Sequence, residues 1–500
     1  MRILLIRPPY LDVQTLGQPR VGVPIGPLSV AACLEKARHD VMFFDSLLYN
    51  GESGDANHFG ASFGHIEQVV RDFQPDIVGV TNLFSTQMQK AFAVTELIKK
   101  IDRSIKVVVG GPHATAVPQD FLASPSIDMV VVGEGELTAV DIADYYAGKK
   151  DIRDVKGVAY MQAGLLKINK PEYIQNLDDI PFPAYHLVDM EKYFQLAAAG
   201  FGSRPNDIFY QPMREVSMIT SRGCPFECTF CAIHPTMGYK FRYQSPEYVV
   251  NHIELLVKQY KVDFVHFEDD NLTLNPPRFE RILDMLWEKQ ILFGWDTPNG
   301  VRADALPRRL LEKIKRSDVR ELRIAIESAD QDVLEKIVRK RLDLNKVMES
   351  VRNCKELGIQ LSAFYVVGMP GETKELIQKT LDLAYDLMKN YNVFPHVNVA
   401  MPLVGTEMYD IAVKNDYMVK TGYETGSIFG MGMMRTEEFG PEDIKAMTGE
   451  FYKKVRNLYI IKTVKSPKKM ARNIRVFVRY PRSSMRLLKT AIRYTEKVNE

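Results

Sequence analysis

The sequence lacks the features of a membrane-spanning or secreted protein. No stretch approaches the roughly 18 consecutive apolar residues that a transmembrane helix requires. The first apolar run covers only residues 3–6 and is closed by Arg7 and Pro8. Such a short run predicts a buried strand rather than a signal peptide. We therefore expect a cytoplasmic protein.

Cysteine is scarce, with five residues among 500. A small, odd number in a chain without a secretory signal argues against a disulfide framework. Cys33 and Cys354 stand alone in helix-like apolar patterns, and we interpret them as core thiols. The other three, Cys224, Cys228 and Cys231, fall within eight consecutive positions, which indicates a shared task.

Charge of either sign is not in large excess, because the net charge is +2, but it is unevenly distributed. Residues 462–500 contain twelve Lys or Arg and two Glu, a net charge of +10, which leaves −8 for residues 1–461. A nucleic-acid-binding enzyme needs positive charge around its site, so we expect no nucleic acid partner.

The basic tail has a pattern of its own around residues 482–497. Apolar residues recur there at helical spacing with basic residues beside them: Met485, Leu488 and Ile492, with Arg486, Lys489 and Arg493. This pattern fits a solvated charged helix, and it also fits a helix that rests on anionic lipid. Peripheral membrane contact through the tail therefore stays open.

Short apolar runs alternate with helical patterns over residues 1–150, which predicts a doubly wound parallel sheet. The five predicted strands are Ile3–Ile6, Val41–Phe44, Asp76–Val80, Lys106–Val109 and Asp128–Val132. Ligands of such sheets bind beyond the carboxyl ends of the strands. Small residues lie at these ends and would let a large ligand approach the backbone: Thr81-Asn82, Gly110-Gly111 and Gly133-Glu134-Gly135.

A second alternating series follows a proline-containing connector over residues 151–215. Its six predicted strands are Val216–Thr220, Phe264–Phe267, Thr297–Val301, Leu322–Ile326, Leu361–Val367 and Val397–Ala400. Amphipathic helices such as Pro246–Gln259, with Ser245 as N-cap, and Lys374–Met388 separate them. Residues 216–430 therefore predict a partial (β/α)6 barrel, and residues 431–500 a helical segment with the basic tail. The whole chain belongs to the α/β class.

The three clustered cysteines directly follow the first barrel strand, where barrel enzymes keep their chemistry. Three thiolates on one loop can hold three irons of a four-iron cluster and leave the fourth iron open for a ligand. A structural zinc site completed by His234 is the alternative. It is less favoured because a structural zinc normally stabilises a small domain that lacks a core. An electron-transfer cluster would need a fourth cysteine.

The sequence Cys224-Pro225-Phe226-Glu227-Cys228-Thr229-Phe230-Cys231 resembles the cluster motif of the radical S-adenosylmethionine (SAM) superfamily. The resemblance implies a [4Fe–4S] cluster on the three cysteines that cleaves SAM reductively to a 5′-deoxyadenosyl radical. It also implies SAM contacts at the ends of the barrel strands, on Phe230, Glu268, Asp269, Asn299, Arg302, Glu327, Ser328 and Gly368. The last of these begins a Gly-Met-Pro-Gly-Glu turn similar to one in the family.

Residues 1–150 resemble the flavodoxin-like cobalamin-binding domain of the radical SAM subfamily called class B. The resemblance implies cobalamin contacts on Pro24, Gly26, Thr81, Asn82, Gly110, Gly111, His113, Gly133, Glu134 and Gly135. The Asp-x-His-x-x-Gly motif, which supplies a histidine ligand to cobalt in other cobalamin proteins, is absent from the sequence. His113 is therefore expected at the corrin edge or in solvent rather than on cobalt.

These resemblances imply methylation of an unactivated carbon, with the radical removing a hydrogen atom, methylcobalamin giving the methyl group and a second SAM restoring it. Ring closure or rearrangement is the alternative outcome within the same family. A corrinoid-binding protein with a structural barrel is the alternative from another class. We expect a small-molecule or lipid-like substrate and a reductant such as flavodoxin or ferredoxin.

Overall fold

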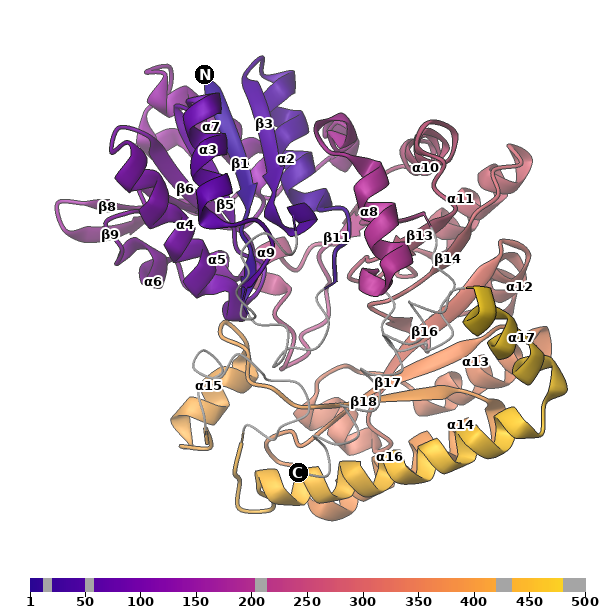
Figure 1. Cartoon of the computed structure of the whole chain (residues 1–500). Coiled ribbons are helices and arrows are strands. Elements are labelled where there is room, and N and C mark those ends of the chain that lie inside the picture. Colours follow the sequence, from indigo (N-terminus) through magenta and orange to yellow (C-terminus); the bar gives the residue numbers. More distant parts are fainter. Residues whose placement is uncertain (12–19, 50–57, 203–213, 420–433, 480–500) are drawn as a thin grey trace. The chain divides into compact units, whose positions relative to one another are not determined.

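The computed structural model of the chain describes residues 1–11, 20–49, 58–202, 214–419 and 434–479. The chain forms two compact units (Figure 1). Unit 1 contains residues 1–193 with residues 232–238, and unit 2 contains most of the remainder. In the described ranges, every helix is too short or too polar to cross a membrane.

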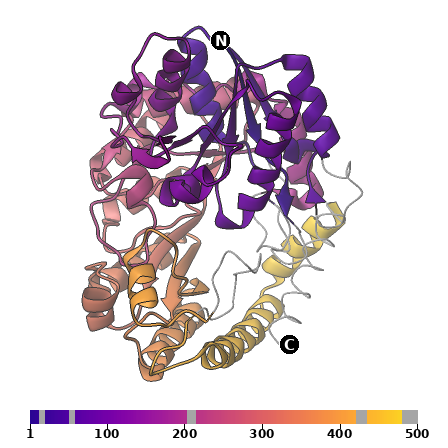
Figure 2. The same cartoon turned by 90° about the vertical axis from the view of Figure 1, so that its left-hand side faces the viewer.

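Unit 1 is built on a seven-stranded sheet in the order β3-β1-β5-β6-β7-β8-β9. The first five strands are parallel, and their order is that of a flavodoxin-like doubly wound sheet, as the sequence predicts. Figure 2 shows helices flanking these strands. The strands are β1 (Arg2–Arg7), β3 (Asp40–Asp45), β5 (Ile77–Thr81), β6 (Lys106–Gly110), β7 (Met129–Val131), β8 (Val158–Gln162) and β9 (Leu165–Ile168).

In the described part of unit 1, six helices surround this sheet, and a short antiparallel pair of strands lies apart from it. The helices are α2 (Ile25–Lys36), α3 (Phe63–Phe73), α4 (Met88–Ile101), α5 (Pro112–Ala116), α6 (Pro118–Leu122) and α7 (Gly135–Tyr146). The pair is β2 (Tyr10–Leu11) with β4 (His58–Phe59). The parallel strands are almost entirely buried, which explains their continuous apolar sequence.

Part of the expected connector, residues 151–215, forms two strands of the first sheet. β8 and β9 form a hairpin that extends the first sheet in antiparallel fashion. Its two-residue turn, Ala163-Gly164, has both residues at positive φ (50° and 77°), as a tight hairpin requires. Alanine is an unusual residue in that conformation, which is why the hairpin is hard to predict from local sequence.

Unit 2 contains six parallel strands in the order β10-β13-β14-β16-β17-β18, the predicted partial barrel. They are β10 (Glu215–Met218), β13 (Phe264–Phe267), β14 (Gly294–Asp296), β16 (Val319–Glu327), β17 (Leu361–Val367) and β18 (Phe394–Val399). Two short strands, β11 (Ser221–Arg222) and β12 (Arg242–Tyr243), pair antiparallel after β10.

The position of the third predicted barrel strand, Thr297–Val301, is wrong. The strand ends at Asp296, and Pro298-Asn299-Gly300 form a turn with Gly300 at φ +82°. Proline has no N–H to donate to a sheet, so the ladder is interrupted there. It resumes as β15 (Val301–Arg302), which pairs with β16.

Helices of unit 2 cover the outer side of the barrel strands. They are α10 (Pro246–Tyr260), α11 (Pro276–Glu288), α12 (Arg308–Arg316), α13 (Leu344–Leu357) and α14 (Lys374–Tyr391). The short helix α15 (Glu407–Lys414) also belongs to unit 2, α9 (His234–Met237) belongs to unit 1, and α8 (Met190–Leu196) spans the boundary between the units in the sequence. The Ser245 hydroxyl accepts from Tyr248 N, which confirms it as the N-cap of α10. Phe267, Phe279 and Trp295 pack edge to face at centroid distances of 5.5–6.1 Å, which joins α11 to the strands.

The predicted helical C-terminal segment consists of α16 (Pro441–Val464) and α17 (Pro467–Arg479) in its described part. α16 packs on α14 and covers the edge of the sheet, because the Tyr452 hydroxyl bonds both N and O of Val397 at 3.0 Å. Such cover satisfies backbone groups that an edge strand leaves unpaired. The predicted helix at 482–497 lies outside the described residues.

Candidate functional site

The cysteine loop, residues 223–231, follows the carboxyl end of β10 as the sequence predicts. Its three cysteines are partly exposed. Burial raises the pKa of the Cys228 thiol to about 12 against the opposing charge of Lys340, and the neighbouring thiols of Cys231 and Cys224 add to the rise. The three thiols therefore lie near one another, with Lys340 as a cation beside Cys228.

The carboxyl end of β13 supports the strand that leads into this loop. Asp269 is fully buried, and its Oδ1 accepts from Thr220 N and from the hydroxyls of Thr220 and Ser221 at 2.5–3.1 Å. Burial raises the pKa of this carboxyl group. Asp269 was predicted to contact SAM, but in this conformation it orders the backbone before the cysteines.

The next two residues of β13's end hold the cysteine loop itself. Asp270 Oδ2 accepts from Gly223 N at 2.9 Å, and Gly223 has φ +79°, a conformation that favours glycine. Asn271 Nδ2 lies 3.9 Å from Cys224 Sγ, within hydrogen-bonding distance of sulfur. The family resemblance implied SAM contacts on Glu268 and Asp269 of this acidic segment, and the role of Asp270 and Asn271 in holding the loop was missed.

A second support for the loop is the segment Ile337–Arg341, which follows a short π-helical turn after β16. Thr229 donates to this segment twice, from N to Val338 O at 3.1 Å and from Oγ1 to Ile337 O at 2.9 Å. The loop therefore cannot shift without breaking these bonds. No motif pointed to this segment, although its three consecutive cations, residues 339–341, were a visible signal.

Arg302 connects residues 337–341 to Phe226 in the first part of the cysteine loop. Its guanidinium donates to Lys340 O, Arg341 O and twice to Asp304, and it lies over the Phe226 ring at 3.9 Å. Four of the five guanidinium donors are thus engaged within the protein. Arg302 therefore stabilises the loop through packing and charge, and its predicted SAM contact would have to use the remaining donor.

Lys340 and Glu327 form a buried ion pair beside Cys228. The lysine Nζ donates to Glu327 Oε1 at 2.7 Å and to Ala325 O at 2.8 Å, and both side chains are less than a tenth exposed. Glu327 has φ +68° at a register shift between β16 and β17. A non-glycine residue at positive φ is uncommon and often marks a functional position. Lys340 was missed by sequence reasoning.

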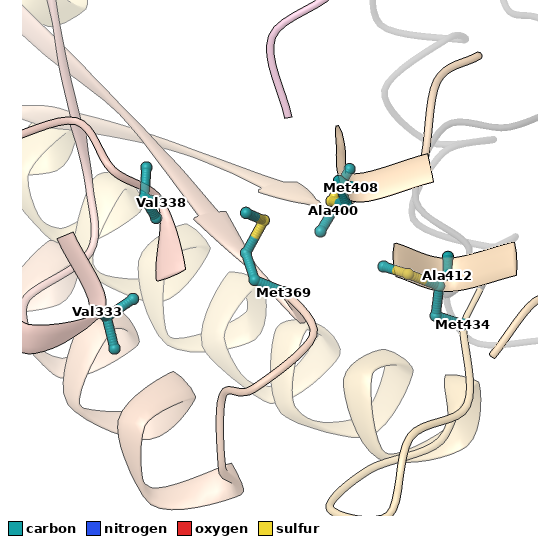
Figure 3. Close-up of a cluster of buried hydrophobic side chains, with 7 residues drawn as sticks. All are labelled: Val333, Val338, Met369, Ala400, Met408, Ala412 and Met434. Atoms are coloured by element: carbon teal, nitrogen blue, oxygen red, sulfur yellow. The ribbon is translucent and has the colours of Figure 1, made fainter. Parts of the chain in front are cut away.

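An apolar cluster surrounds the aromatic residue of the motif. Figure 3 shows the Met369 side chain between two valines on one side and Ala400 and Met408 on the other. Phe230 packs against this cluster, whose buried members are Val333, Val338, Met369, Ala400, Met408, Ala412 and Met434. Met408 N also donates to Thr229 O at 2.9 Å. The cluster gives Phe230 an apolar, polarizable surface to pack on.

The remaining predicted SAM contacts fall into two groups. Glu268 is partly exposed and Asn299 is exposed; Ser217 Oγ donates to Glu268 Oε1 at 2.7 Å, and Asn299 Nδ2 to Glu268 O at 2.8 Å. Ser328 is fully buried and hydrogen-bonded to Thr380, which makes it structural in this conformation. Gly368 has φ +83°, and its turn packs against α16.

Glu372 closes this Gly-Met-Pro-Gly-Glu turn. It is fully buried, and its Oε2 accepts from Met369 N at 2.7 Å. Burial raises its pKa to about 7, although bonds from the Met369 and Gly368 backbone oppose the rise. The turn is therefore fixed by its own last residue.

The chemistry of the loop's donor set fits an iron–sulfur cluster, because three cysteines lie on one loop and cysteine thiolates are the usual ligands of such clusters. Over the described ranges, no group of three His, Cys, Asp or Glu side chains is arranged to hold a single metal ion.

The predicted cobalamin residues lie along the carboxyl edge of unit 1's sheet, but several of them face inward. Asn82 is fully buried, and Asn82 N donates to Gly110 O at 2.7 Å. Glu134 Oε2 accepts from Ile174 N at 2.7 Å. Gly111, at φ +119°, lies so close to Asn82 that an added Cβ would be 2.4 Å from Asn82 O. These residues shape the edge by close backbone packing.

His113 is buried beside this edge rather than exposed to solvent. Its Nδ1 lies 3.1 Å from Ser85 Oγ, and its ring contacts Phe121 edge to face. Burial lowers its pKa to about 4, so the ring is neutral at physiological pH. Of the two expected positions, solvent is therefore wrong, and the corrin edge stays a prediction.

Other positions on the edge remain open to a ligand. Gly26, in the first turn of α2, has no neighbouring heavy atom within 4 Å of an added Cβ. Leu83 and Phe84, directly after β5, are 44% and 56% exposed. Two large exposed apolar residues at this edge offer a surface for a flat macrocycle. Sequence reasoning stopped at Thr81-Asn82 and missed them.

Comparison with known families agrees with this geometry. Residues 218–384 match the Radical SAM superfamily, and residues 19–143 match the B12 binding domain. The chain is a radical SAM enzyme with a B12-binding domain. The two domains occur in the predicted order, and they confirm the expected cofactor classes, SAM with an iron–sulfur cluster and cobalamin. A non-catalytic corrinoid protein is accordingly not supported.

Relatives of this radical SAM enzyme include two methyltransferases. An uncharacterized methyltransferase of Pyrococcus horikoshii is 28% identical over 454 residues, 90% of this chain and 92% of the relative. Cytidylyl-2-hydroxyethylphosphonate methyltransferase of Streptomyces wedmorensis is 28% identical over 466 residues, 84% of each chain. Anaerobic magnesium-protoporphyrin IX monomethyl ester cyclase of Rubrivivax gelatinosus is 28% identical over 358 residues, 69% of this chain and 59% of the relative.

The fold of this radical SAM enzyme is similar to that of the cobalamin-dependent SAM radical enzyme OxsB, solved with aqua-cobalamin and SAM bound. The TM-score is 0.71 at 16% sequence identity, covering 97% of this chain and 72% of OxsB. At this identity the similarity confirms the fold: a B12-binding sheet, a radical SAM barrel and a helical C-terminal segment in one chain.

Proposed function

We propose that this enzyme methylates an unactivated carbon atom of a small-molecule or lipid-like substrate. The observation that carries the proposal is the three-thiol loop, held at the carboxyl end of β10 by β13 and by residues 337–341, in a chain that also has a B12-binding domain. The two methyltransferase relatives span most of this chain, which supports methyl transfer as the outcome.

The protein's contribution is to hold and shield the cofactors. When bound, cluster, SAM and cobalamin supply a hydrogen-abstracting radical and a methyl group, at the expense of two SAM and two electrons from a reductant such as flavodoxin or ferredoxin. Cys224, Cys228 and Cys231 would bind the cluster. Lys340 stabilises negative charge at Cys228, and its positive charge suits the SAM carboxylate. The apolar side chains against which Phe230 packs would exclude water from the adenine of SAM.

Unit 1 would hold cobalamin at the carboxyl edge of its sheet. Gly26 leaves space there, and Leu83 and Phe84 present apolar surface to the corrin ring. His113 is buried on Ser85 and Phe121, so in this conformation it is not presented as a cobalt ligand.

Anaerobic reconstitution tests the proposal. The full chain is loaded with iron, sulfide and cobalamin, then incubated with SAM and a reductant, and nucleoside products are measured. Methylation produces both 5′-deoxyadenosine and S-adenosylhomocysteine. The Cys228→Ser variant should lose the iron–sulfur absorbance and both products attributable to the radical cycle, whereas Cys354→Ser, which removes a buried thiol on α13, should keep them.

Ring closure or rearrangement is the second candidate, because a cyclase is among the relatives. It predicts 5′-deoxyadenosine without S-adenosylhomocysteine. A preparation that holds one zinc ion tightly and forms neither product would contradict both candidates.

A further inference from the structure

The last two described helices expose a stripe of large apolar side chains. On α17, Met470, Ile474, Phe477 and Val478 recur at the spacing that places them on one face of a helix, and Val478 is 73% exposed. The end of α16 continues the exposure with Ile460, Ile461 and Val464. Figure 1 shows these helices in yellow, with α17 turning back after α16.

This stripe is separate from the surface by which α16 packs on the barrel. The packed side contains the buried residues Ile444, Phe451 and Val455 and the hydroxyl of Tyr452, which is bonded to β18. Lys462 caps the carboxyl end of α14 through the carbonyls of residues 388 and 389. The exposed apolar residues are therefore not required to attach α16, and in the described part of the chain their side chains remain open to solvent.

The charge of the same helix restricts what could cover the stripe. The 13 residues of α17 include five basic residues and no acidic one: Lys468, Lys469, Arg472, Arg475 and Arg479. A second copy of the chain would bring like charges together, which is unfavourable. An anionic lipid bilayer matches both the apolar stripe and the positive charge of α17, because its headgroups are negatively charged and the layer below them is apolar.

We propose that α17, together with the carboxyl end of α16, attaches this enzyme to the surface of anionic membranes. The exposed apolar side chains of α17 insert at the level of the lipid headgroups. The proposal concerns attachment, so it does not depend on which reaction the enzyme catalyses. It places the contact on described helices, N-terminal to the tail helix suggested by the sequence at 482–497.

Vesicle flotation of the full chain tests this proposal. We expect binding to vesicles of phosphatidylcholine mixed with phosphatidylglycerol, little binding to phosphatidylcholine alone, and weakening as ionic strength rises. The triple variant Ile474→Ser/Phe477→Ser/Val478→Ser should weaken binding at least about tenfold. Arg475→Glu, which keeps the apolar stripe, should weaken binding to anionic vesicles several-fold.

A matched control is Trp287→Ser/Leu292→Ser, which removes two equally exposed apolar side chains near the end of α11 and should bind as the wild type does. Circular dichroism and the iron–sulfur absorbance report that the variants fold. Absence of wild-type binding, equal binding to both vesicle types, or full binding by the triple variant would each overturn the proposal. So would a dimer in solution that the triple variant converts to a monomer, since a second copy would then cover the stripe.

Discussion

Single buried residues determine how the cysteine loop is held. Lys340 contacts Glu327 and Ala325 O and acts on Cys228 through its charge, while Asp269 and Thr229 fix the backbone on either side of the loop. Each of these groups is buried, so water cannot take the place of a hydrogen-bonding partner that has been removed. Two predictions follow from such burial.

Lys340→Met should lower the free energy of unfolding of unit 2 by about 3 kcal/mol, because it leaves the buried Glu327 carboxyl group without its cation. The double variant Lys340→Met/Glu327→Gln should recover most of that loss. Urea unfolding followed by tryptophan fluorescence measures the effect in unit 2, which contains both tryptophans, Trp287 and Trp295. As a control, Lys336→Met breaks an exposed pair with Asp332 and should cost less than about 0.5 kcal/mol; equal losses at both lysines would contradict the interpretation.

His266 should make the stability of unit 2 depend on pH. Burial disfavours its charge, but hydrogen bonds and charge from Asp296 and Glu215 more than offset this and raise its pKa to about 9. The protonated ring therefore stabilises the fold fully below pH 6.5, and this contribution, on the order of 3 kcal/mol, is lost as pH rises through about 9. Urea unfolding between these pH values should show the decline in the wild type, and His266→Gln should be flatter. A parallel decline in both proteins would assign it to other groups.

At the scale of elements, short turns at the carboxyl ends of the strands position every candidate site. The turn at residues 298–300 makes the third barrel strand end earlier than the sequence predicts. Gly111 packs tightly against Asn82 at the carboxyl ends of β6 and β5. The residue types at these turns can be read from the sequence. The sequence does not show which of these residues face a ligand and which pack against backbone.

Two predicted cobalamin glycines should therefore respond differently to the same substitution. Gly111→Ala should destabilise unit 1 by about 3 kcal/mol, since its Cβ would clash with Asn82 O at a positive φ. Gly26→Ala should be neutral or slightly stabilising, because it lies in a helix with open space around it. Hydrogen–deuterium exchange of β5 and β6 measures this, because unit 1 has no tryptophan. If Gly26 contacts the corrin, Gly26→Ala would weaken cobalamin binding without faster exchange; equal exchange in both variants would refute the packing argument.

At the scale of the whole molecule, each candidate cofactor site is built within one unit. All candidate cobalamin residues belong to unit 1, and the three cysteines with their supports belong to unit 2. The two sites can therefore be damaged separately, which bears on how the enzyme should be tested.

Cofactor loading should show this separation. Cys228→Ser should lose the iron–sulfur absorbance and retain cobalamin absorbance at the wild-type level, and Gly111→Ala should lose cobalamin while retaining the iron content. Absorbance spectra and iron analysis of the reconstituted proteins measure both. Loss of both cofactors in either variant would show that one site forms only when the other is filled.

The sequence by itself determined the α/β class, the order of the two domains, five strands of the first sheet, most of the barrel strands and the position of the three-cysteine loop after the first barrel strand. These follow from local signals: apolar runs of strand length, turn residues and thiols at a fixed spacing. The hairpin β8–β9 and the shifted third barrel strand were missed because tertiary pairing, rather than local propensity, decides whether such short runs join a sheet.

Only the tertiary structure decided what the candidate residues do. Asp269, Arg302, Ser328, Asn82 and Glu134 have the polar or charged side chains expected of ligand contacts, yet they are buried against other groups of the protein. Lys340 is far from Cys228 in the sequence, and the two come close because residues 337 and 338, just before Lys340, accept hydrogen bonds from Thr229 in the loop. Sequence spacing fixes contacts along a strand or a helix, whereas contacts between distant segments depend on how the strands are ordered and closed into the barrel.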